Sequence, residues 1–163
     1  MMSLSQANAM DAAGFTAQFG DIAEHSPWVS AQVRRPFATR AAMVEAFAHV
    51  VMTAPPALQL SLLQAHPDLA TRARLTPEST REQKGAGLDS LTVDEFARFT
   101  ALNERYKRQN GFPFIFAVKG ATKHQILASF EDRIHHSREI EFEVALEQVC
   151  KIIGFRLDAQ VAE

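Results

Sequence analysis

Apolar residues recur every three or four positions along most of this 163-residue chain, which places them on one face of an α-helix. The pattern covers five stretches: residues 39–54, 55–65, 91–109, 121–136 and 137–157. Each such helix has to bury its apolar face against the others, because an isolated helix of this length is marginal in water. The spacing therefore restricts the chain to packed helices.

Two of these stretches begin with a capping box, in which two side chains three residues apart satisfy the first amides of a helix. The pairs are Thr92 with Glu95 and Thr122 with Gln125. No two alternating segments flank a hairpin turn, and no repeat or linker divides the chain. We therefore expect an all-α fold, a single-domain helical bundle.

Composition narrows the class of protein further. Hydrophobic residues make up 47% of the chain and charged residues 22%, the balance of a folded globular protein. The formal net charge of −2 gives no electrostatic reason to expect nucleic acid or an anionic membrane as a partner. No apolar run approaches the ~20 residues of a membrane span, and residues 1–10 lack the pattern of a signal peptide. We expect a cytoplasmic protein, with neither membrane nor nucleic acid as partner.

The sequence offers no recognisable metal site. The single cysteine, Cys150, excludes an internal disulfide and any cysteine-rich zinc centre. His135 and His136 are adjacent in a helical pattern and face different directions, so they are poorly placed to share a metal. No HExxH, P-loop, GxGxxG or GxSxG motif occurs.

Residues 111–120, GFPFIFAVKG, break the helical pattern. The segment is aromatic, β-branched and bounded by glycines, so we expect an extended apolar segment at about 111–119. Its backbone N–H and C=O groups then need partners although no neighbouring strand is expected. Either side chains of packed helices satisfy them, or some are left for a ligand rich in amide groups.

The stretch QAHPDLA, residues 64–70, ends a helical pattern on a histidine followed by proline. Proline fixes its own φ and restricts the preceding residue to extended geometry, so His66 is held outside the helical hydrogen-bond ladder. This arrangement suits a structural stop. It also suits a general base, because histidine changes its protonation state near neutral pH.

Ser79 and Glu82 have the spacing of a third capping box. In that interpretation Ser79 caps a helix and the Glu82 side chain reaches back to the Ser79 amide. However, the glycines at 85 and 87 cut the helix short about a turn later, so a cap would stabilise little by itself. A short helix between glycines can instead shape a pocket, and the residues alone leave both interpretations open.

Arg156 continues the apolar stripe of the last helical stretch, which runs through Phe142, Leu146, Val149 and Ile153. In the final turn of a helix an arginine can extend to water and interact with the helix dipole. Alternatively, its guanidinium points into a cleft and binds a carboxylate or carbonyl in a forked geometry. One poised histidine, one carboxylate, one arginine and an extended segment are consistent with a cofactor-free acid–base site, but they name no substrate.

Four stretches of the chain, taken in order, resemble the 2-oxo-4-hydroxy-4-carboxy-5-ureidoimidazoline (OHCU) decarboxylase family of urate degradation. They are HPDLA, STREQKGAGLDSLTVDEFARFTALNERY, GFPFIFAVKG and EFEVALEQVCKIIGFRL. The resemblance runs from about residue 14 to 158, so it implies one OHCU decarboxylase-like domain over residues 1–163. It also implies an all-helical bundle, a homodimer, and a carboxy-lyase without cofactor or metal. That enzyme would convert the small molecule OHCU to (S)-allantoin and carbon dioxide.

The resemblance further implies a set of site residues. The catalytic residues would be His66 and Glu82. Substrate would be bound by Pro67, Ser79, Gln83, Phe114, Ile115 and Arg156. Phe114 and Ile115 would contact it partly through their backbone, and we expect the Phe114 side chain to hold one face of the substrate toward the proton source.

A non-catalytic helical interaction module is the competing interpretation. In that case HPDLA is only a helix stop, and the aromatic segment is a surface for a partner protein. A metal hydrolase is a poorer alternative, because no ligand spacing supports one. Turnover of OHCU separates the first two interpretations.

Overall fold

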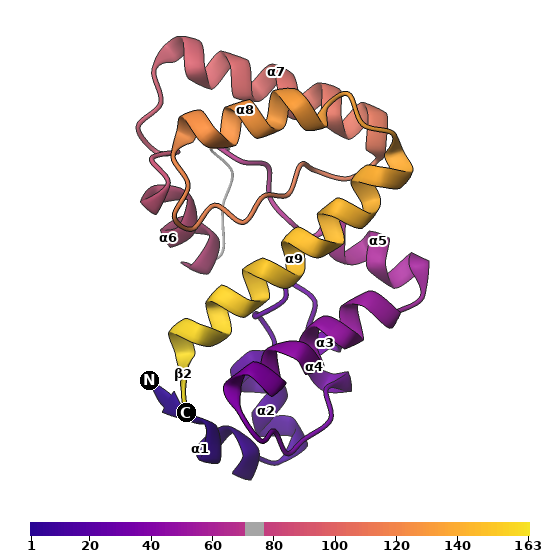
Figure 1. Cartoon of the computed structure of the whole chain (residues 1–163), viewed down its shortest axis with the longest axis vertical. Coiled ribbons are helices and arrows are strands. Elements are labelled where there is room, and N and C mark those ends of the chain that lie inside the picture. Colours follow the sequence, from indigo (N-terminus) through magenta and orange to yellow (C-terminus); the bar gives the residue numbers. More distant parts are fainter. Residues whose placement is uncertain (71–76) are drawn as a thin grey trace. The chain divides into compact units, whose positions relative to one another are not determined.

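The computed structural model describes residues 1–70 and 77–163 and is mostly helical (Figure 1). The helices are α1 (Leu4–Ala9), α2 (Ala12–Phe19), α3 (Trp28–Gln32), α4 (Arg40–Thr53), α5 (Pro56–Gln64), α6 (Pro77–Gly85), α7 (Val93–Asn110), α8 (Lys123–Arg133) and α9 (Arg138–Gln160). Two short strands, β1 (Met2–Ser3) and β2 (Val161–Ala162), pair in parallel and bring the two chain ends together. The expected all-α class is confirmed. The sequence did not predict this pairing, because two residues carry no alternating pattern.

The described chain divides into two compact units. One comprises Met1–Ala65 together with Val149–Glu163, and the other comprises His66–Gln148. Helix α9 contributes its first half to the second unit and its second half to the first. The expectation of one functional domain over residues 1–163 remains a prediction.

The first unit is built around stacked phenylalanines. The Phe15 ring lies 4.7 Å from the Phe19 ring within α2 and 6.2 Å from the Phe47 ring of α4, measured between centroids. All three side chains are buried. Arg40, at the start of α4, pairs with Asp158 at 2.9 Å and donates to the Val161 carbonyl, which ties the end of α9 to this core.

No single helix in the described residues is both long enough and apolar enough to cross a membrane. Helices α4 and α5 reach that length and apolar composition only when taken together, and the two are bent by 111° relative to one another. Within its own unit, α4 buries Met43, Phe47 and Val51.

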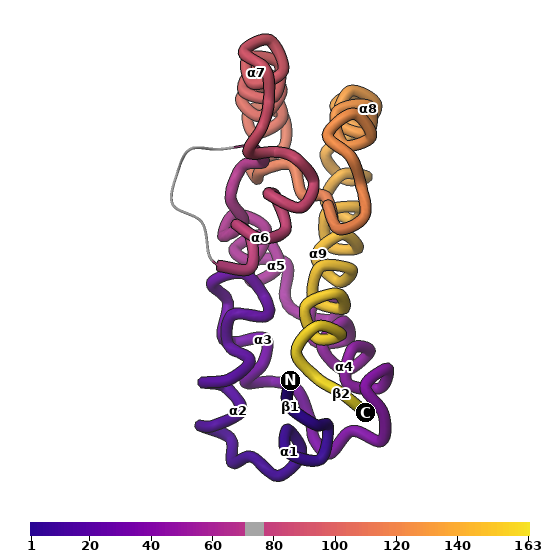
Figure 2. Tube along the Cα trace, turned by 90° about the vertical axis from the view of Figure 1, so that its left-hand side faces the viewer, coloured from indigo at the N-terminus to yellow at the C-terminus, as the bar shows by residue number. Residues whose placement is uncertain are grey.

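In the second unit, α7 and α8 run side by side in the same direction (Figure 2). Near their starts, Glu95 of α7 pairs with Lys123 of α8 at 2.8 Å. Near their ends, the Tyr106 and Phe130 rings meet edge to face, with 5.9 Å between centroids. Both helices begin with the capping boxes predicted from the sequence.

This parallel arrangement explains the extended segment between the two helices. The chain leaves the end of α7 and must return to the start of α8, and the 18 residues of α7 span about 27 Å. Ten extended residues can reach about 33 Å, whereas ten helical residues would cover only about 15 Å. Residues 112–118 contain neither helix nor strand, so the predicted extended segment is confirmed.

Gly111 provides a test of how α7 ends. It adopts φ 80° and donates its N–H to the Lys107 carbonyl at 2.8 Å, and an added Cβ would meet no atom within 4 Å. Gly111→Ala should therefore lose about 1 kcal/mol through backbone strain alone, which lowers Tm by about 2–4 °C. Gly85→Ala is the matched control, because its Cβ is equally unhindered and its φ is not positive. An equal loss of Tm in both variants would contradict this explanation.

Candidate active site

His66 lies where the sequence predicts, just beyond the end of a helix. Helix α5 ends at Gln64, and Ala65 closes it by donating its N–H to the Ser61 carbonyl at 3.0 Å. His66 is therefore outside the helical ladder, and it is 9% exposed. A buried imidazole fixed at the start of a loop is a suitable position for a general base.

The loop after His66 is held in place by side chains from α7. Lys107 pairs with Asp68 at 2.8 Å, and the Asn103 side-chain amide donates to the Leu69 carbonyl at 2.9 Å. Asn103 Oδ1 is buried with no hydrogen-bond partner in the described part of the chain. One face of α7 thus anchors the loop through polar contacts and leaves an acceptor beside it.

Ala70, the last described residue of this segment before residue 77, has a strained conformation. Its φ is 57°, a region that residues with a Cβ rarely adopt. Its N–H donates to the Gln83 side-chain oxygen at 3.0 Å, which joins the loop directly to α6. Gln83 therefore helps to hold Ala70 in this conformation.

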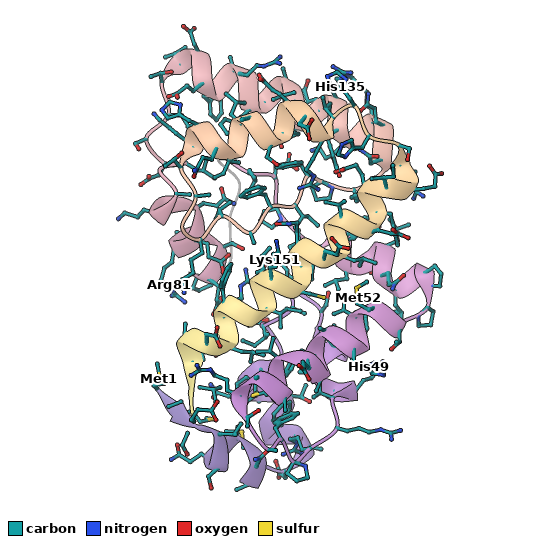
Figure 3. All side chains as sticks on the ribbon, in the orientation of Figure 1. Met1, His49, Met52, Arg81, His135 and Lys151 are labelled. Atoms are coloured by element: carbon teal, nitrogen blue, oxygen red, sulfur yellow. The ribbon has the colours of Figure 1, made fainter. Side chains whose placement is uncertain are left out.

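Helix α6 turns a polar face inward. Ser79 and Gln83 are buried and Glu82 is half-buried, and their spacing of three and four residues places them on one face. Arg81 lies outside this face and is exposed (Figure 3). The inward face of a surface helix is normally apolar, so this face is unusual; Ser79 and Glu82 have interaction partners within the protein.

The alternative role of Ser79 as a helix cap is wrong. Helix α6 begins at Pro77, which places Ser79 inside the helix as its third residue. The reason is that proline is favoured in the first helical position, so the helix starts three residues earlier than the capping-box spacing predicts. Ser79 and Glu82 therefore do not form a capping box.

Gln83 has only part of its hydrogen-bonding capacity occupied. Its oxygen accepts from Ala70, but its NH₂ group has no partner in the part of the chain that the structure describes. This NH₂ group is therefore available to donate to a ligand.

The Phe114 side chain lies in the core of the second unit. It is fully buried and stacks on the Phe130 ring, with 3.8 Å between centroids and 7° between planes. The Arg133 guanidinium also lies over the Phe114 ring, 4.3 Å from its centroid, and the Tyr106 ring meets the Phe114 ring edge to face. Parallel packing of α7 and α8 draws the ring into the core, and the expectation that it holds one face of the substrate remains a prediction.

Backbone groups of the extended segment are only partly satisfied. Arg133 donates to the Ile115 carbonyl at 2.7 Å, and the Ala117 N–H donates to the Gln148 side-chain oxygen at 2.9 Å. For these two groups, side chains of packed helices are the partners. In the described residues, the N–H groups of Phe114, Ile115 and Phe116 have no hydrogen-bond partner. Because Ile115 is 3% exposed, these unused donors fit a ligand with amide or carboxylate oxygens.

A buried ionic cluster lies behind this segment. Glu141 is fully buried, and its Oε1 accepts from Arg133 Nε at 2.9 Å and from the Tyr106 hydroxyl at 2.6 Å. Its Oε2 lies 2.9 Å from His136 Nδ1. Burial, together with the neighbouring Glu141 carboxylate, raises the pKa of the Tyr106 hydroxyl well above its usual range.

Arg156 lies in the other unit and is 5% exposed, so the idea that it extends to water is wrong. Its Nη1 lies 3.0 Å from Glu24 Oε2 and 3.1 Å from the Ile22 carbonyl. Glu24 is itself fully buried. The buried carboxylate draws the guanidinium inward, since an unpaired buried charge of either sign would be unfavourable.

Sequence patterns did not identify several of these polar residues. Asn103 carried a weak signal, because it interrupts the buried face of α7 one helical turn after Phe99. Glu24 and Glu141 carried none, since their arginine partners are distant in the sequence or separated by a helix end. Among the described residues, no group of three or more His, Cys, Asp or Glu side chains is placed to hold a metal ion.

A pocket of about 260 Å³ lies between Ala70 and the start of α7. None of the expected site residues lines it. Among the residues that the structure describes, Asp89 is the only ionisable one that lines it, so they do not supply the acid–base pair that the sequence predicts.

Comparison with known proteins identifies the family of this chain. The family described as OHCU decarboxylase matches residues 8–158. A relative from Haloferax volcanii, named 2-oxo-4-hydroxy-4-carboxy-5-ureidoimidazoline decarboxylase, is 42% identical over 96% of this chain and 94% of its own length. A uric acid degradation bifunctional protein from a Bacillus species is 40% identical, and this chain spans 32% of it.

Solved structures give the same result. A crystal structure of (S)-allantoin synthase superimposes with a TM-score of 0.81 at 34% identity. The match covers 98% of this chain and 54% of that one, so this chain spans about half of the longer protein. By its sequence match over nearly its whole length, the chain belongs to the OHCU decarboxylase family.

Proposed function

We propose that this protein decarboxylates OHCU to (S)-allantoin and carbon dioxide in urate degradation. The observation that carries this proposal is the inward polar face of α6, joined to the loop of His66 through the Gln83–Ala70 hydrogen bond. Membership of the OHCU decarboxylase family supports it. The unused amide donors of residues 114–116 suit a substrate rich in carbonyl and carboxylate oxygens.

The substrate itself supplies the electron sink. Its reacting ring carbon carries a carboxylate and a hydroxyl and lies next to a C=N carbon that bears the ureido group. When the carboxylate leaves as carbon dioxide, its bonding electron pair forms a carbon–carbon double bond and the C=N electrons move to the ring nitrogen. The reaction therefore needs no external electron-accepting cofactor.

His66 and Glu82 are the catalytic residues of this proposal. His66 accepts the hydroxyl proton, and the ring nitrogen takes up a proton from solvent. Glu82 orients His66 or accepts a hydrogen bond from the same hydroxyl. The ring carbonyl forms as the carbon–carbon double bond takes up a proton at the ureido-bearing carbon on one face, which sets the S configuration.

The remaining residues bind the substrate. Pro67 forms part of the wall beside His66, and Ser79 and Gln83 hydrogen-bond from the face of α6. Phe114 and Ile115 contribute backbone N–H groups rather than side chains.

Arg156 is assigned to the ring or ureido oxygens. A salt bridge to the departing carboxylate would stabilise the ground state more than the transition state, and only interactions that strengthen in the transition state raise the rate. Negative charge accumulates on the ring during decarboxylation, so a guanidinium there accelerates the reaction.

The family resemblance also supports a homodimer and a cytoplasmic location as parts of this proposal. Light scattering coupled to size-exclusion chromatography gives the mass directly, because the chain alone is 18.1 kDa. A mass near twice that value is expected.

The test of the activity is turnover of freshly generated OHCU, followed by ultraviolet absorbance and by circular dichroism of the product. Uncatalysed decay gives racemic allantoin, so an optically active product measured above background supports the proposal. Racemic product at the uncatalysed rate would favour a non-catalytic interaction module instead.

His66→Ala should lower kcat by about 10²–10⁴, the usual contribution of a general acid–base group. Tm should change little, because His66 lies outside the ladder of α5. His49→Ala is the matched control, since His49 is an exposed histidine on α4. A folded His66 variant with turnover near that of wild type would remove His66 from catalysis.

Glu82→Gln should lower kcat sharply while Tm stays within about 1 °C. The reason is that glutamine preserves shape but removes the negative charge that orients the base. Glu78→Gln on the same helix controls for the loss of a carboxylate, because Glu78 is half-buried and lies 3.9 Å from exposed Arg81. Equal activity in the two variants would assign Glu82 a structural role only.

A further inference from the structure

We propose that Arg133, locked in place by Glu141, is a positioning residue that aims the peptide group between Ile115 and Phe116 at the substrate. This inference rests on the proposed function and adds a residue pair to it. Neither side chain belongs to the expected site, and both lie behind the extended segment, within the same unit.

The contacts of Arg133 leave it little freedom. The residue is 5% exposed, and its guanidinium donates through Nη1 to the Ile115 carbonyl and through Nε to Glu141. Nη2 lies 2.8 Å from the same Glu141 oxygen but is not aligned for a hydrogen bond. The flat guanidinium also covers the Phe114 ring. These contacts fix the position of Nη1, and therefore the direction of the carbonyl that it holds.

The direction of the Ile115 carbonyl sets the direction of one amide donor. A peptide group is planar, and in the described residues the only cis peptide bond is Arg35–Pro36, so the bond between Ile115 and Phe116 is trans. In a trans peptide the N–H points opposite to the C=O. Arg133 on the carbonyl side therefore holds the Phe116 N–H pointing away from the ionic cluster, where it has no partner in the described residues.

Arg133 also makes that N–H a better donor. A hydrogen bond from a charged guanidinium to a carbonyl polarises the whole peptide group, and hydrogen bonds in a chain strengthen one another at low dielectric. The positive charge of Arg133 is balanced by Glu141, so the cluster adds no net charge behind the substrate. Arg133 thus acts on the substrate only through the peptide group.

Glu141 holds Arg133 from the opposite side. Both of its oxygens are engaged, one by Arg133 Nε and the Tyr106 hydroxyl and the other near His136 Nδ1. Contacts at both oxygens fix the carboxylate, and those with Arg133 and His136 remain when the Tyr106 hydroxyl is removed. If Arg133 and Glu141 have only a structural role, their loss should lower Tm alone. If they position the peptide group, their loss should also weaken substrate binding.

The test removes both charges together, because one unpaired buried charge would unfold the unit. In the double variant Arg133→Met, Glu141→Gln, the Ile115 carbonyl loses its donor while the core stays neutral and filled. We expect KM for OHCU to rise about five- to tenfold, as for one lost hydrogen bond, with kcat within about twofold. The Kd of (S)-allantoin, measured by calorimetry, should rise by a similar factor.

Tyr106→Phe is the matched control. It removes a buried hydrogen bond to the same Glu141 oxygen and lowers Tm, but leaves the contact between Arg133 and Ile115 intact. Its KM should stay within about twofold of wild type. Arg133→Lys retains a charged donor, so its KM should lie closer to wild type than that of the double variant.

The outcomes are distinct. A folded double variant with wild-type KM and Kd would overturn the positioning role, and so would a KM in Tyr106→Phe that rises as much as in the double variant. Absence of turnover by the wild-type protein would instead overturn the proposed function, and the inference that rests on it.

Discussion

The parallel packing of α7 and α8 is the constraint on which the second unit depends. It requires the chain to return through the interior in extended form, because a helix of the same number of residues is too short. An extended segment without neighbouring strands exposes both edges of its backbone to whatever surrounds it. Arg133 and Gln148 satisfy part of it from α8 and α9, while the amide donors of residues 114–116 remain for a ligand.

Polar side chains also hold the backbone in the other part of the candidate site. The loop that begins at His66 ends on a strained Ala70, and polar side chains from α6 and α7 hold it there. The buried face of α6 is polar because its partners are a loop backbone and, in the proposed function, a polar substrate. In the proposed function, the strain at Ala70 and the unused amide donors serve the binding of one small anionic molecule.

The helices could be predicted from the sequence because their signals are local. Apolar spacing and the Thr92 and Thr122 capping boxes are visible within a few residues, and so is the proline that stops the chain after His66. The capping-box spacing of Ser79 and Glu82 predicted the wrong start for α6, because the helix begins earlier, with proline in its first position. The partners of Arg133 and Arg156 could not be predicted, since Glu141 and Glu24 reach them only through tertiary packing. The packing of the Phe114 ring into the core has the same cause: helix order alone does not say that α7 and α8 are parallel.

The central claim is that the unpartnered N–H groups of residues 114–116 bind substrate, while protein side chains hold the Ile115 carbonyl and the Ala117 N–H. Amide chemical shifts in ¹⁵N-labelled protein test it directly, with (S)-allantoin added as a stable ligand. The account predicts saturable shifts for the Ile115 and Phe116 amides, with the Ala117 amide, which already donates to Gln148, changing little. Saturable shifts confined to residues outside 114–116 would contradict it.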